Sequence, residues 1–243
     1  PGRLIQHVNE KNIKVGEVKY LVFDESDQMF DQGFTEDCAY LITRVSNQVQ
    51  LILSSATLTE KVKAFIDQEI PSYHLLEIGT KIPTKIVQEK IYCEIQDKNE
   101  LLLKFFSKRK FKRAMIFCNT KNKTENLSEF LQDHKIKARS LSGRLEQRDR
   151  QDRLNLLKAG QISVLVTTDV AARGLHVPKV DLVINYDIPT RDEFYVHRIG
   201  RTGRDNRQGY SLSLICPEDE ERFLRIETKH NLEIKNAKFL ETS

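Results

Sequence analysis

Short apolar runs alternate with amphipathic segments along the whole chain. The apolar runs are rich in Val, Ile, Leu and aromatic residues and predict strands, while the segments between them carry apolar residues three and four positions apart, as on one face of a helix. This alternation predicts an α/β fold in which helices cover parallel sheets. The expected strands are 20–23, 50–55, 73–78, 86–95, 114–119, 138–142, 163–168, 182–187 and 209–216, and the clearest helices are 121–132 and 147–157.

One segment, GTKIPTKI at 79–86, interrupts the pattern. Its Gly, Pro and two Lys residues follow neither a helical nor a strand period, which predicts a linker. Five strand–helix units follow this segment, enough for a complete domain, whereas about three precede it. We therefore expect two parallel-sheet domains, a first one at 1–78 that is truncated at its amino end and a second one at 87–243.

Composition narrows the class of protein. With 39% apolar and 30% charged residues in 243, the chain has the profile of an ordinary soluble globular protein. It has no apolar stretch of the ~18–20 residues that span a membrane and no signal-peptide pattern. The cysteines are far apart and form no C-x-x-C pair, which argues against structural zinc and disulfides and favours an intracellular location, cytoplasmic or nuclear. They are Cys38, Cys93, Cys118 and Cys216.

The charge balance is mildly basic, with a net charge of +4 and a pI near 8.8, and this alone is a weak sign of a polyanionic partner. A sharper feature is the run KRKFKR at 108–113. Its simplest interpretation is a solvated turn before the strand 114–119. A nucleic-acid patch or a localisation signal is the alternative, and the sequence leaves both open.

An acidic cluster follows the first predicted strand, 20–23. Asp24, Glu25 and Asp27 stand at its carboxyl end, the end at which open parallel sheets bind ligands. Paired carboxylates there can fix Mg²⁺ on a triphosphate and orient an attacking water. Taken alone, the cluster could equally be an exposed acidic loop or a helix N-terminus.

Two further segments favour the magnesium-site interpretation of the acidic cluster. SAT at 55–57 ends the next predicted strand and offers the hydroxyls of Ser55 and Thr57 as hydrogen-bond partners for the carboxylates. Much further along, HRIGRTGR at 197–204 interleaves four basic side chains with two glycines. Guanidinium groups match phosphate oxygens, and glycines allow a close approach of the backbone to a ligand.

These segments, in this order and spacing, resemble the DEAD-box RNA helicases. The resemblance rests on DESD (24–27), SAT, TTDVAARG (167–174) and HRIGRTGR, together with PGR (1–3), GFTEDCAYLI (33–42) and the Q-x-x-R of 147–150, and it covers essentially the whole chain. It implies two RecA-like domains and an ATP-dependent helicase that couples ATP binding and hydrolysis to local RNA unwinding or remodelling. It also implies ATP and Mg²⁺ as cofactors, RNA read with little sequence specificity, protein activators as further partners, and a monomer.

The resemblance assigns roles at the nucleotide site. Asp24 would hold magnesium through water, and Glu25 would position the hydrolytic water. Asp27 would link to Ser55, Thr57 and His197 and couple hydrolysis to domain closure. Arg201 and Arg204 would reach the γ-phosphate as arginine fingers, and Asp169 and Gly174 would belong to the motif that joins the nucleotide and RNA sites.

The RNA contacts that the resemblance implies are small, polar or backbone-exposing residues rather than base readers, which predicts recognition of shape and phosphates. Each of them, taken singly, can equally be a helix cap or a turn residue. They are Gly2 and Arg3 in the first domain and Thr120, Gly143, Gln147, Arg150 and Thr168 in the second.

Two departures from the family pattern carry predictions. His176 stands where the family usually has an Asp near the nucleotide ribose, so we expect altered nucleotide affinity. The phosphate-gripping loop G-x-x-x-x-G-K-[ST] is absent from the sequence, so this chain alone is predicted not to hydrolyse ATP, and residues 1–80 are predicted to expose normally covered surface. The alternative function is a non-catalytic RNA-binding or regulatory module derived from a helicase; a DNA helicase is disfavoured by SAT and HRIGRTGR.

Overall fold

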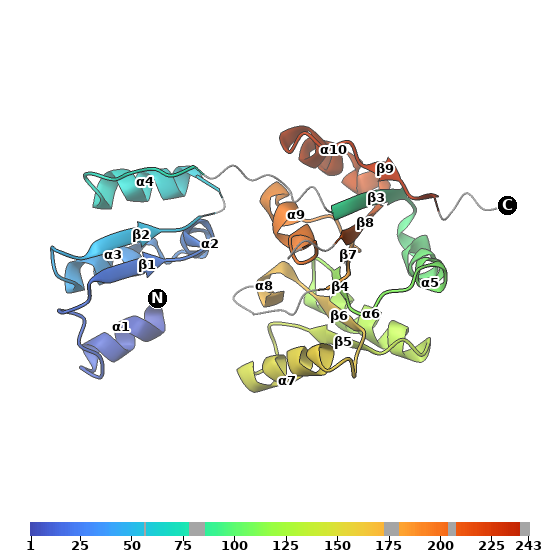
Figure 1. The fold of residues 1–243 in the computed structure, drawn as a ribbon, viewed down its shortest axis with the longest axis horizontal. Coiled ribbons are helices and arrows are strands. Elements are labelled where there is room, and N and C mark those ends of the chain that lie inside the picture. Colours follow the sequence, from blue (N-terminus) through green and yellow to red (C-terminus); the bar gives the residue numbers. More distant parts are fainter. Residues whose placement is uncertain (56, 78–85, 173–179, 204–207, 239–243) are drawn as a thin grey trace. The chain divides into compact units, whose positions relative to one another are not determined.

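The computed structural model describes residues 1–55, 57–77, 86–172, 180–203 and 208–238 (Figure 1). The chain divides into two compact units, Pro1–Thr80 and Lys81–Ser243. This division falls inside the segment that the sequence predicts to be a linker. Ile86, the last residue of that segment, already belongs to a strand.

The first unit contains a two-stranded parallel sheet. Strand β1 pairs with β2 in a register that runs from Tyr20 opposite Gln50 to Phe23 opposite Leu53. Three helices contribute side chains to its core, which is built from Phe23, Phe30, Cys38, Leu41, Val62, Phe65 and Ile66. The elements are α1 (Gly2–Asn9), β1 (Tyr20–Phe23), α2 (Ser26–Asp31), α3 (Thr35–Arg44), β2 (Gln50–Leu53) and α4 (Glu60–Glu69).

The two faces of this small sheet are unlike. Successive side chains of a strand point to opposite faces, and Phe23 is buried in the core whereas its neighbour Val22 is 53% exposed. Tyr20 and Ile52 are exposed as well, at 61% and 39%. The first unit therefore leaves apolar sheet surface uncovered, as the sequence analysis predicts.

One predicted strand of this unit does not form. Residues 73–77 have no regular secondary structure, and Tyr73, Leu75 and Leu76 are exposed. A strand requires a partner for its backbone hydrogen bonds, and an apolar run cannot show whether such a partner exists. The prediction of a strand at 73–78 is therefore wrong for the described residues 73–77.

The second unit is built on a seven-stranded sheet with the strand order β5-β6-β4-β7-β8-β3-β9, in which every pairing is parallel. Its elements are β3 (Ile86–Tyr92), the 3-10 turn η1 (Ile95–Asp97), α5 (Lys98–Lys108), β4 (Ala114–Phe117), α6 (Lys121–Asp133), β5 (Ala138–Leu141), α7 (Gln147–Lys158), β6 (Val164–Thr167), α8 (Asp169–Ala172), β7 (Leu182–Asn185), α9 (Asp192–Ile199), β8 (Gly209–Ile215), the 3-10 turn η2 (Pro217–Asp219), α10 (Glu220–Lys229) and β9 (Lys235–Asn236). The six predicted strands of this unit all form, and each is one to three residues shorter than expected.

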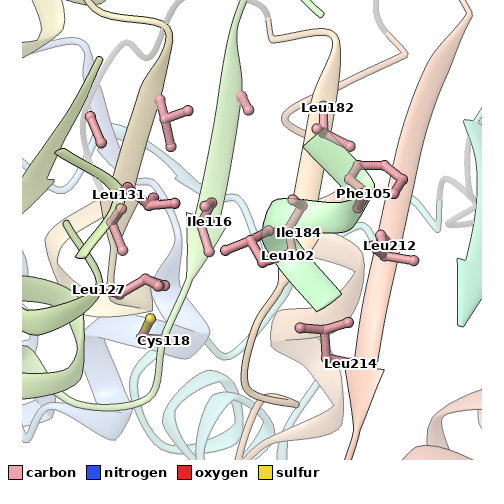
Figure 2. Packing of buried hydrophobic residues seen from close by; sticks show 14 of the residues in the cluster. Leu102, Phe105, Ile116, Cys118, Leu127, Leu131, Leu182, Ile184, Leu212 and Leu214 are labelled. Atoms are coloured by element: carbon pink, nitrogen blue, oxygen red, sulfur yellow. The ribbon is translucent and has the colours of Figure 1, made fainter. Parts of the chain in front are cut away.

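Both faces of the larger sheet are covered. Figure 2 shows one face, where Leu102 of α5 and Leu127 of α6 pack against Ile116 and Ile184 of the central strands. The alternate side chains of β4 and its neighbours form a second cluster on the other face, with Met115, Phe117, Leu154, Leu157, Leu165 and Val183. The predicted α/β class with parallel sheets is confirmed.

Candidate functional site

A strained turn presents the first acidic residues. Glu25 adopts a left-handed backbone conformation with φ 51° and ψ 44°, which is uncommon for a residue other than Gly, Asn or Asp. The Glu25 N–H donates to Asp24 Oδ1 at 3.0 Å, and the Ser26 N–H donates to the carbonyl of Ser54 at 2.9 Å. The turn is thus tied to the end of β2, and the side chains of Asp24 and Glu25 are exposed.

The third carboxylate of the cluster is buried and structural. Asp27 is 4% exposed, and its Oδ2 accepts hydrogen bonds from Thr57 Oγ1 at 2.8 Å and from the Thr57 N–H at 3.1 Å. Its Oδ1 accepts from the Gln28 N–H at 2.9 Å. The Ser55 hydroxyl donates to the Thr57 carbonyl at 2.7 Å. Thr57 therefore meets Asp27 as predicted, whereas Ser55 acts one step away by bracing Thr57.

The exposed carboxylates fit a magnesium ion that keeps most of its water shell. Within the described residues, no group of three or more His, Cys, Asp or Glu side chains could surround a metal ion. Mg²⁺ is usually bound in proteins through one or two carboxylates, with water and substrate phosphates as its other ligands. Asp24 and Glu25, side by side and open to solvent, match that kind of site.

In the second unit, the predicted RNA contacts gather at the carboxyl edge of the sheet. Thr120 follows β4, Gly143 follows β5 and Thr168 follows β6, which are neighbouring strands. Two of them are also helix caps, because Thr120 Oγ1 accepts from the Lys123 N–H and Thr168 Oγ1 accepts from the Ala171 N–H, each at 3.3 Å. Their hydroxyl oxygens are therefore already engaged with backbone.

Gly143 lies beside two cationic side chains. A Cβ atom at this position would be 3.4 Å from Lys121 Cε and 3.7 Å from Arg150 Nη2, so the Gly backbone, Lys121 and Arg150 converge on one place. The buried Nε of Arg150 has no hydrogen-bond partner within the described residues. Gln147, the first residue of α7, is exposed close by in sequence. The sequence analysis missed Lys121, although its place directly after the predicted contact Thr120 could have indicated it.

Arg198, the second residue of HRIGRTGR, is buried and joins several elements of the second unit. It is 1% exposed, and it donates to both oxygens of Asp169 at 2.7 Å. It also donates to the Asp187 carbonyl at 2.6 Å, to Asn119 Oδ1 at 3.1 Å and to Asn185 Oδ1 at 3.3 Å. The hydrogen bonds of Arg198 therefore join α8, α9 and the ends of β4 and β7, so this basic residue of HRIGRTGR has a structural role.

Asp187 forms the other half of this buried network. Its Oδ1 accepts from Lys98 Nζ at 3.2 Å and Lys123 Nζ at 3.1 Å, and its Oδ2 accepts from the Asn119 N–H at 2.9 Å. Burial alone would raise the pKa of Asp187, but the Asn119 hydrogen bond and the two ammonium groups outweigh it, so its pKa is lowered. The same carboxylate raises the pKa of Lys98 against the effect of burial. The sequence analysis missed both residues, although Asp187 stands at the end of a predicted strand.

The remaining predicted residues divide into placed and undescribed ones. His197 lies on α9, and Arg201 comes two residues after the end of that helix. Both belong to the second unit, whereas Asp27 belongs to the first. The contacts of His197 with Asp27 and of Arg201 with a nucleotide therefore stay predictions. Gly2 and Arg3 are exposed at the start of α1. Three predicted residues, Arg204, Gly174 and His176, lie outside the described residues.

Gly203 shows why a glycine is needed in HRIGRTGR. Its φ is +70°, and a Cβ atom there would come within 2.5 Å of Ile86 Cγ1 on β3. The sequence predicts that the glycines of HRIGRTGR let the backbone come close to a ligand. At Gly203, the backbone instead comes close to Ile86 of strand β3.

Comparisons with known proteins agree with the motif order. Residues 1–65 match the family model of the DEAD/DEAH box helicase, and residues 97–206 match that of the helicase conserved C-terminal domain. The ATP-dependent RNA helicase DeaD of Buchnera aphidicola is 37% identical over 98% of this chain. The chain belongs to the DEAD-box RNA helicase family.

Other members of the DEAD-box family extend this comparison. The ATP-dependent RNA helicase RhlB of Haemophilus influenzae is 41% identical over 89% of this chain. The solved structure of Saccharomyces cerevisiae Dbp5 bound to RNA and ADP BeF3 matches 98% of this chain and 64% of that chain with a TM-score of 0.87 and 28% identity. The fold is therefore that of two RecA-like units, the first of them partial.

This DEAD-box chain covers 40% of the length of DeaD and 53% of RhlB, about half of the curated relatives that it matches. Within the described residues, none of the helices has both the length and the apolar character that crossing a membrane requires.

Proposed function

We propose that this chain works in an ATP-dependent RNA helicase, in which ATP binding and hydrolysis are coupled to local unwinding or remodelling of RNA. The observation that carries the proposal is the exposed Asp24–Glu25 turn, held beside the buried Asp27–Thr57 contact at the carboxyl ends of β1 and β2. A protein that only binds RNA needs no such carboxylates, whereas phosphoryl transfer to water requires groups that hold a cation and orient the attacking water.

At the nucleotide, Asp24 would hold Mg²⁺ through water, and Glu25 would orient the water that attacks the phosphate. Bound Mg²⁺ neutralises charge on the triphosphate. Arg201, together with Arg204, would supply guanidinium groups that stabilise charge developing during transfer. Because these arginines and the carboxylates belong to different units, nucleotide binding would favour a closed state in which they meet the same phosphates, with His197 and Asp27 in contact.

At the RNA, the carboxyl edge of the second sheet would bind the phosphate backbone. Lys121 and Arg150 supply positive charge beside the open backbone of Gly143, and Thr120, Gln147 and Thr168 border the same edge, with Gly2 and Arg3 contributing from the first unit. Phosphate contacts carry no direct sequence information. RNA would therefore bind with little sequence preference, and RNA bent in the closed state could not remain duplex.

The second candidate function is an RNA-binding or regulatory module without ATP turnover. It is favoured by one observation, the absence of G-x-x-x-x-G-K-[ST] from the sequence. We infer that this chain by itself does not hydrolyse ATP, while RNA binding at the carboxyl edge is retained. Protein activators and an intracellular location, cytoplasmic or nuclear, complete the proposal.

The proposal is tested by RNA binding and phosphate release with the 243-residue chain. Arg150→Gln removes one of the two cations beside Gly143, and we expect about tenfold weaker binding of a single-stranded RNA, the equivalent of about 1.4 kcal/mol. Arg148→Gln, an exposed residue on the same helix, is the matched control and should leave the affinity unchanged. DNA of the same sequence should bind more weakly because it lacks the 2′-hydroxyl.

Equal affinities of the wild type and Arg150→Gln would contradict the assignment of this edge to RNA. RNA-stimulated phosphate release from the wild-type chain would contradict its inactivity toward ATP and would leave the helicase assignment standing in a stronger form.

A further inference from the structure

The basic run of the sequence lies at the opposite edge of the second sheet from the predicted RNA contacts. Lys108 ends α5, and the residues up to Arg113 lead into the first residue of β4, Ala114. Lys137 stands in the same way directly before β5. These cations form a basic rim at the amino ends of the strands, which consists of Lys108, Arg109, Lys110, Lys112, Arg113 and Lys137.

Backbone hydrogen bonds fix the order of the rim. The Ser163 N–H donates to the Lys137 carbonyl at 2.8 Å, the Ala114 N–H donates to the Ser163 carbonyl at 2.8 Å, and the Asp181 N–H donates to the Arg113 carbonyl at 2.9 Å. Lys137, Ser163, Arg113 and Asp181 are therefore neighbours along one edge. With strands about 4.8 Å apart, this row extends over roughly 15 Å, which is comparable to a few nucleotides of a single strand.

Two carboxylates lie near the rim, Asp181 and Glu89, and both accept hydrogen bonds from neutral groups. Asp181 Oδ2 accepts from the N–H groups of Lys112 and Arg113, at 2.8 and 3.2 Å. Glu89 accepts a hydrogen bond from the hydroxyl of Tyr210. Among the described residues, the side chains of Lys108, Lys110 and Lys112 form no ion pair, and all three are exposed. Glu89 offsets part of the charge of Arg109, but the rim has six cations against these two carboxylates and so carries a net positive charge.

The surface of the rim is hollowed at two places. Each hollow has a volume of about 180 Å³, and the two share Arg109 and Tyr210. Arg109 lies over the Tyr210 ring, 3.3 Å from its centre, which holds this guanidinium in a defined place. One hollow is lined by Lys108, Lys238 and Arg109 against the single carboxylate Glu89, and the other by Lys110 and Arg109 against the single carboxylate Asp181. Cations therefore outnumber carboxylates in each hollow, which favours a phosphate group.

We propose that the basic rim is a second RNA-binding surface, which binds the phosphate backbone of a strand outside the carboxyl-edge site. This inference takes RNA as the ligand from the proposed function. An acidic protein segment is the other polyanion, but protein interfaces usually bury an apolar core. Of the residues that line the two hollows, Val87 is the large apolar one with substantial exposure, at 37%. A surface that is mainly cationic, with little exposed apolar area, is the pattern of backbone binding to nucleic acid.

The two surfaces can be separated by the length of the RNA. They lie at opposite ends of strands whose four residues alone span about 13 Å, so a strand must pass around the unit to touch both. A six-nucleotide RNA is too short to touch both surfaces at once and should bind mainly at the carboxyl-edge site of the proposed function, whereas a 20-nucleotide RNA can reach the rim as well.

The test is the affinity of the full chain for these two single-stranded RNAs. For the triple variant Lys108→Gln, Lys110→Gln and Lys112→Gln, we expect five- to tenfold weaker binding of the 20-nucleotide RNA and unchanged binding of the six-nucleotide RNA. The slope of log affinity against log salt should fall by about 2 for the longer RNA, since each lost phosphate contact on a single strand contributes about 0.7. These lysines are exposed, so the fold should be retained.

A matched control removes the same charge elsewhere on the unit. Arg148→Gln, Arg225→Gln and Lys229→Gln also lower the net charge by three at exposed positions on α7 and α10 and should leave both affinities unchanged. Unchanged affinity of the rim variant for the longer RNA would overturn the inference while the proposed function stands. An equal loss for both lengths, or for the control, would overturn it in favour of a general charge effect.

The remaining outcomes are also decisive. If wild-type chain binds neither RNA, both the rim and the proposed function are wrong. If the rim variant loses affinity for polyglutamate while its RNA affinities are unchanged, the partner is an acidic protein and the inference is wrong.

Discussion

Both carboxylate oxygens of Asp169 accept hydrogen bonds from the guanidinium of Arg198, each at 2.7 Å. The pair joins the start of α8 to α9, and so joins the sequence segments TTDVAARG and HRIGRTGR. Two-pronged bonds between a guanidinium and a carboxylate fix orientation as well as distance. Arg198 therefore sets the position of α9, the helix that carries His197 and leads to Arg201.

We expect Asp169→Asn to destabilise the second unit by about 3–5 kcal/mol, because it leaves the buried Arg198 charge without its counterion. The measurement is the free energy of unfolding in urea. Asp192→Asn on α9, the helix of Arg198, is the control: its carboxylate is 3.9 Å from the exposed Lys229 Nζ, and such pairs contribute about 0–1 kcal/mol. Similar losses in both variants would show that the buried pair has no special role.

Stability in acid should depend on Asp187. Its pKa is lowered in the folded protein, so its contribution is fully present above the ordinary Asp value of about 3.9 and is lost as the pH falls through the lower folded value. We expect the wild-type urea midpoint to fall steeply below about pH 4.

The variant Asp187→Asn should start from a lower stability at neutral pH and show a shallower fall in acid. Lys123→Gln is the control, because this lysine is 51% exposed and should contribute little. An unchanged acid profile in Asp187→Asn would mean that other carboxylates determine it.

Replacing Glu25, a predicted site residue in a strained conformation, should raise the free energy of unfolding of the first unit. Glu25→Gly relieves the left-handed conformation, in which a residue with a Cβ atom costs on the order of 1 kcal/mol, so the first unit should become more stable by up to about that amount. Asp24→Gly lies outside the left-handed region and should be neutral or destabilising. The unfolding free energies of the two variants decide the matter, and a loss of stability in Glu25→Gly would show that its carboxylate stabilises the fold.

The uncovered face of the small sheet should govern solubility. Val22→Thr places a hydroxyl on exposed surface, so we expect a change in stability within about 0.5 kcal/mol and less aggregation by light scattering. The same change at Val62, which is 1% exposed, should cost about 1–3 kcal/mol because it buries a hydroxyl. If Val22→Thr aggregates as much as the wild type, the surface responsible for aggregation is not this face of the sheet.

The sequence predicts much of the fold because its signals are local. The apolar runs at 114–119, 163–168, 182–187 and 209–216 locate buried strands, since strands covered on both faces are almost continuously apolar. The run at 73–78 has similar composition and forms no strand in its described part. The other runs each have a neighbouring strand to pair with, and the presence of such a partner cannot be read from the local sequence.

The candidate site was predictable where motif and topology coincide, as for Asp27 and Thr57. The sequence analysis did not anticipate the burial of Arg198 or the pairing of Lys98 with Asp187, residues 89 positions apart. Charged residues are usually exposed, and only the folded chain brings a compensating partner to each of them. Thr120 and Thr168 illustrate a third case, in which the helix-cap interpretation is correct for the side chain, while their place at the carboxyl edge remains compatible with RNA.

The parallel sheets also differ in how their backbones are sheltered. Strand β4 has hydrogen-bonded neighbours on both sides, β6 and β7, and all four of its side chains are buried, whereas β1 and β2 pair only with each other among the described strands. Amide protons exchange with solvent when a segment opens locally. Those of β4 should therefore persist to the unfolding limit of the second unit, while those of β1 exchange through smaller openings. The proposed RNA edge thus rests on a slowly opening sheet, and the acidic turn on one that opens more readily.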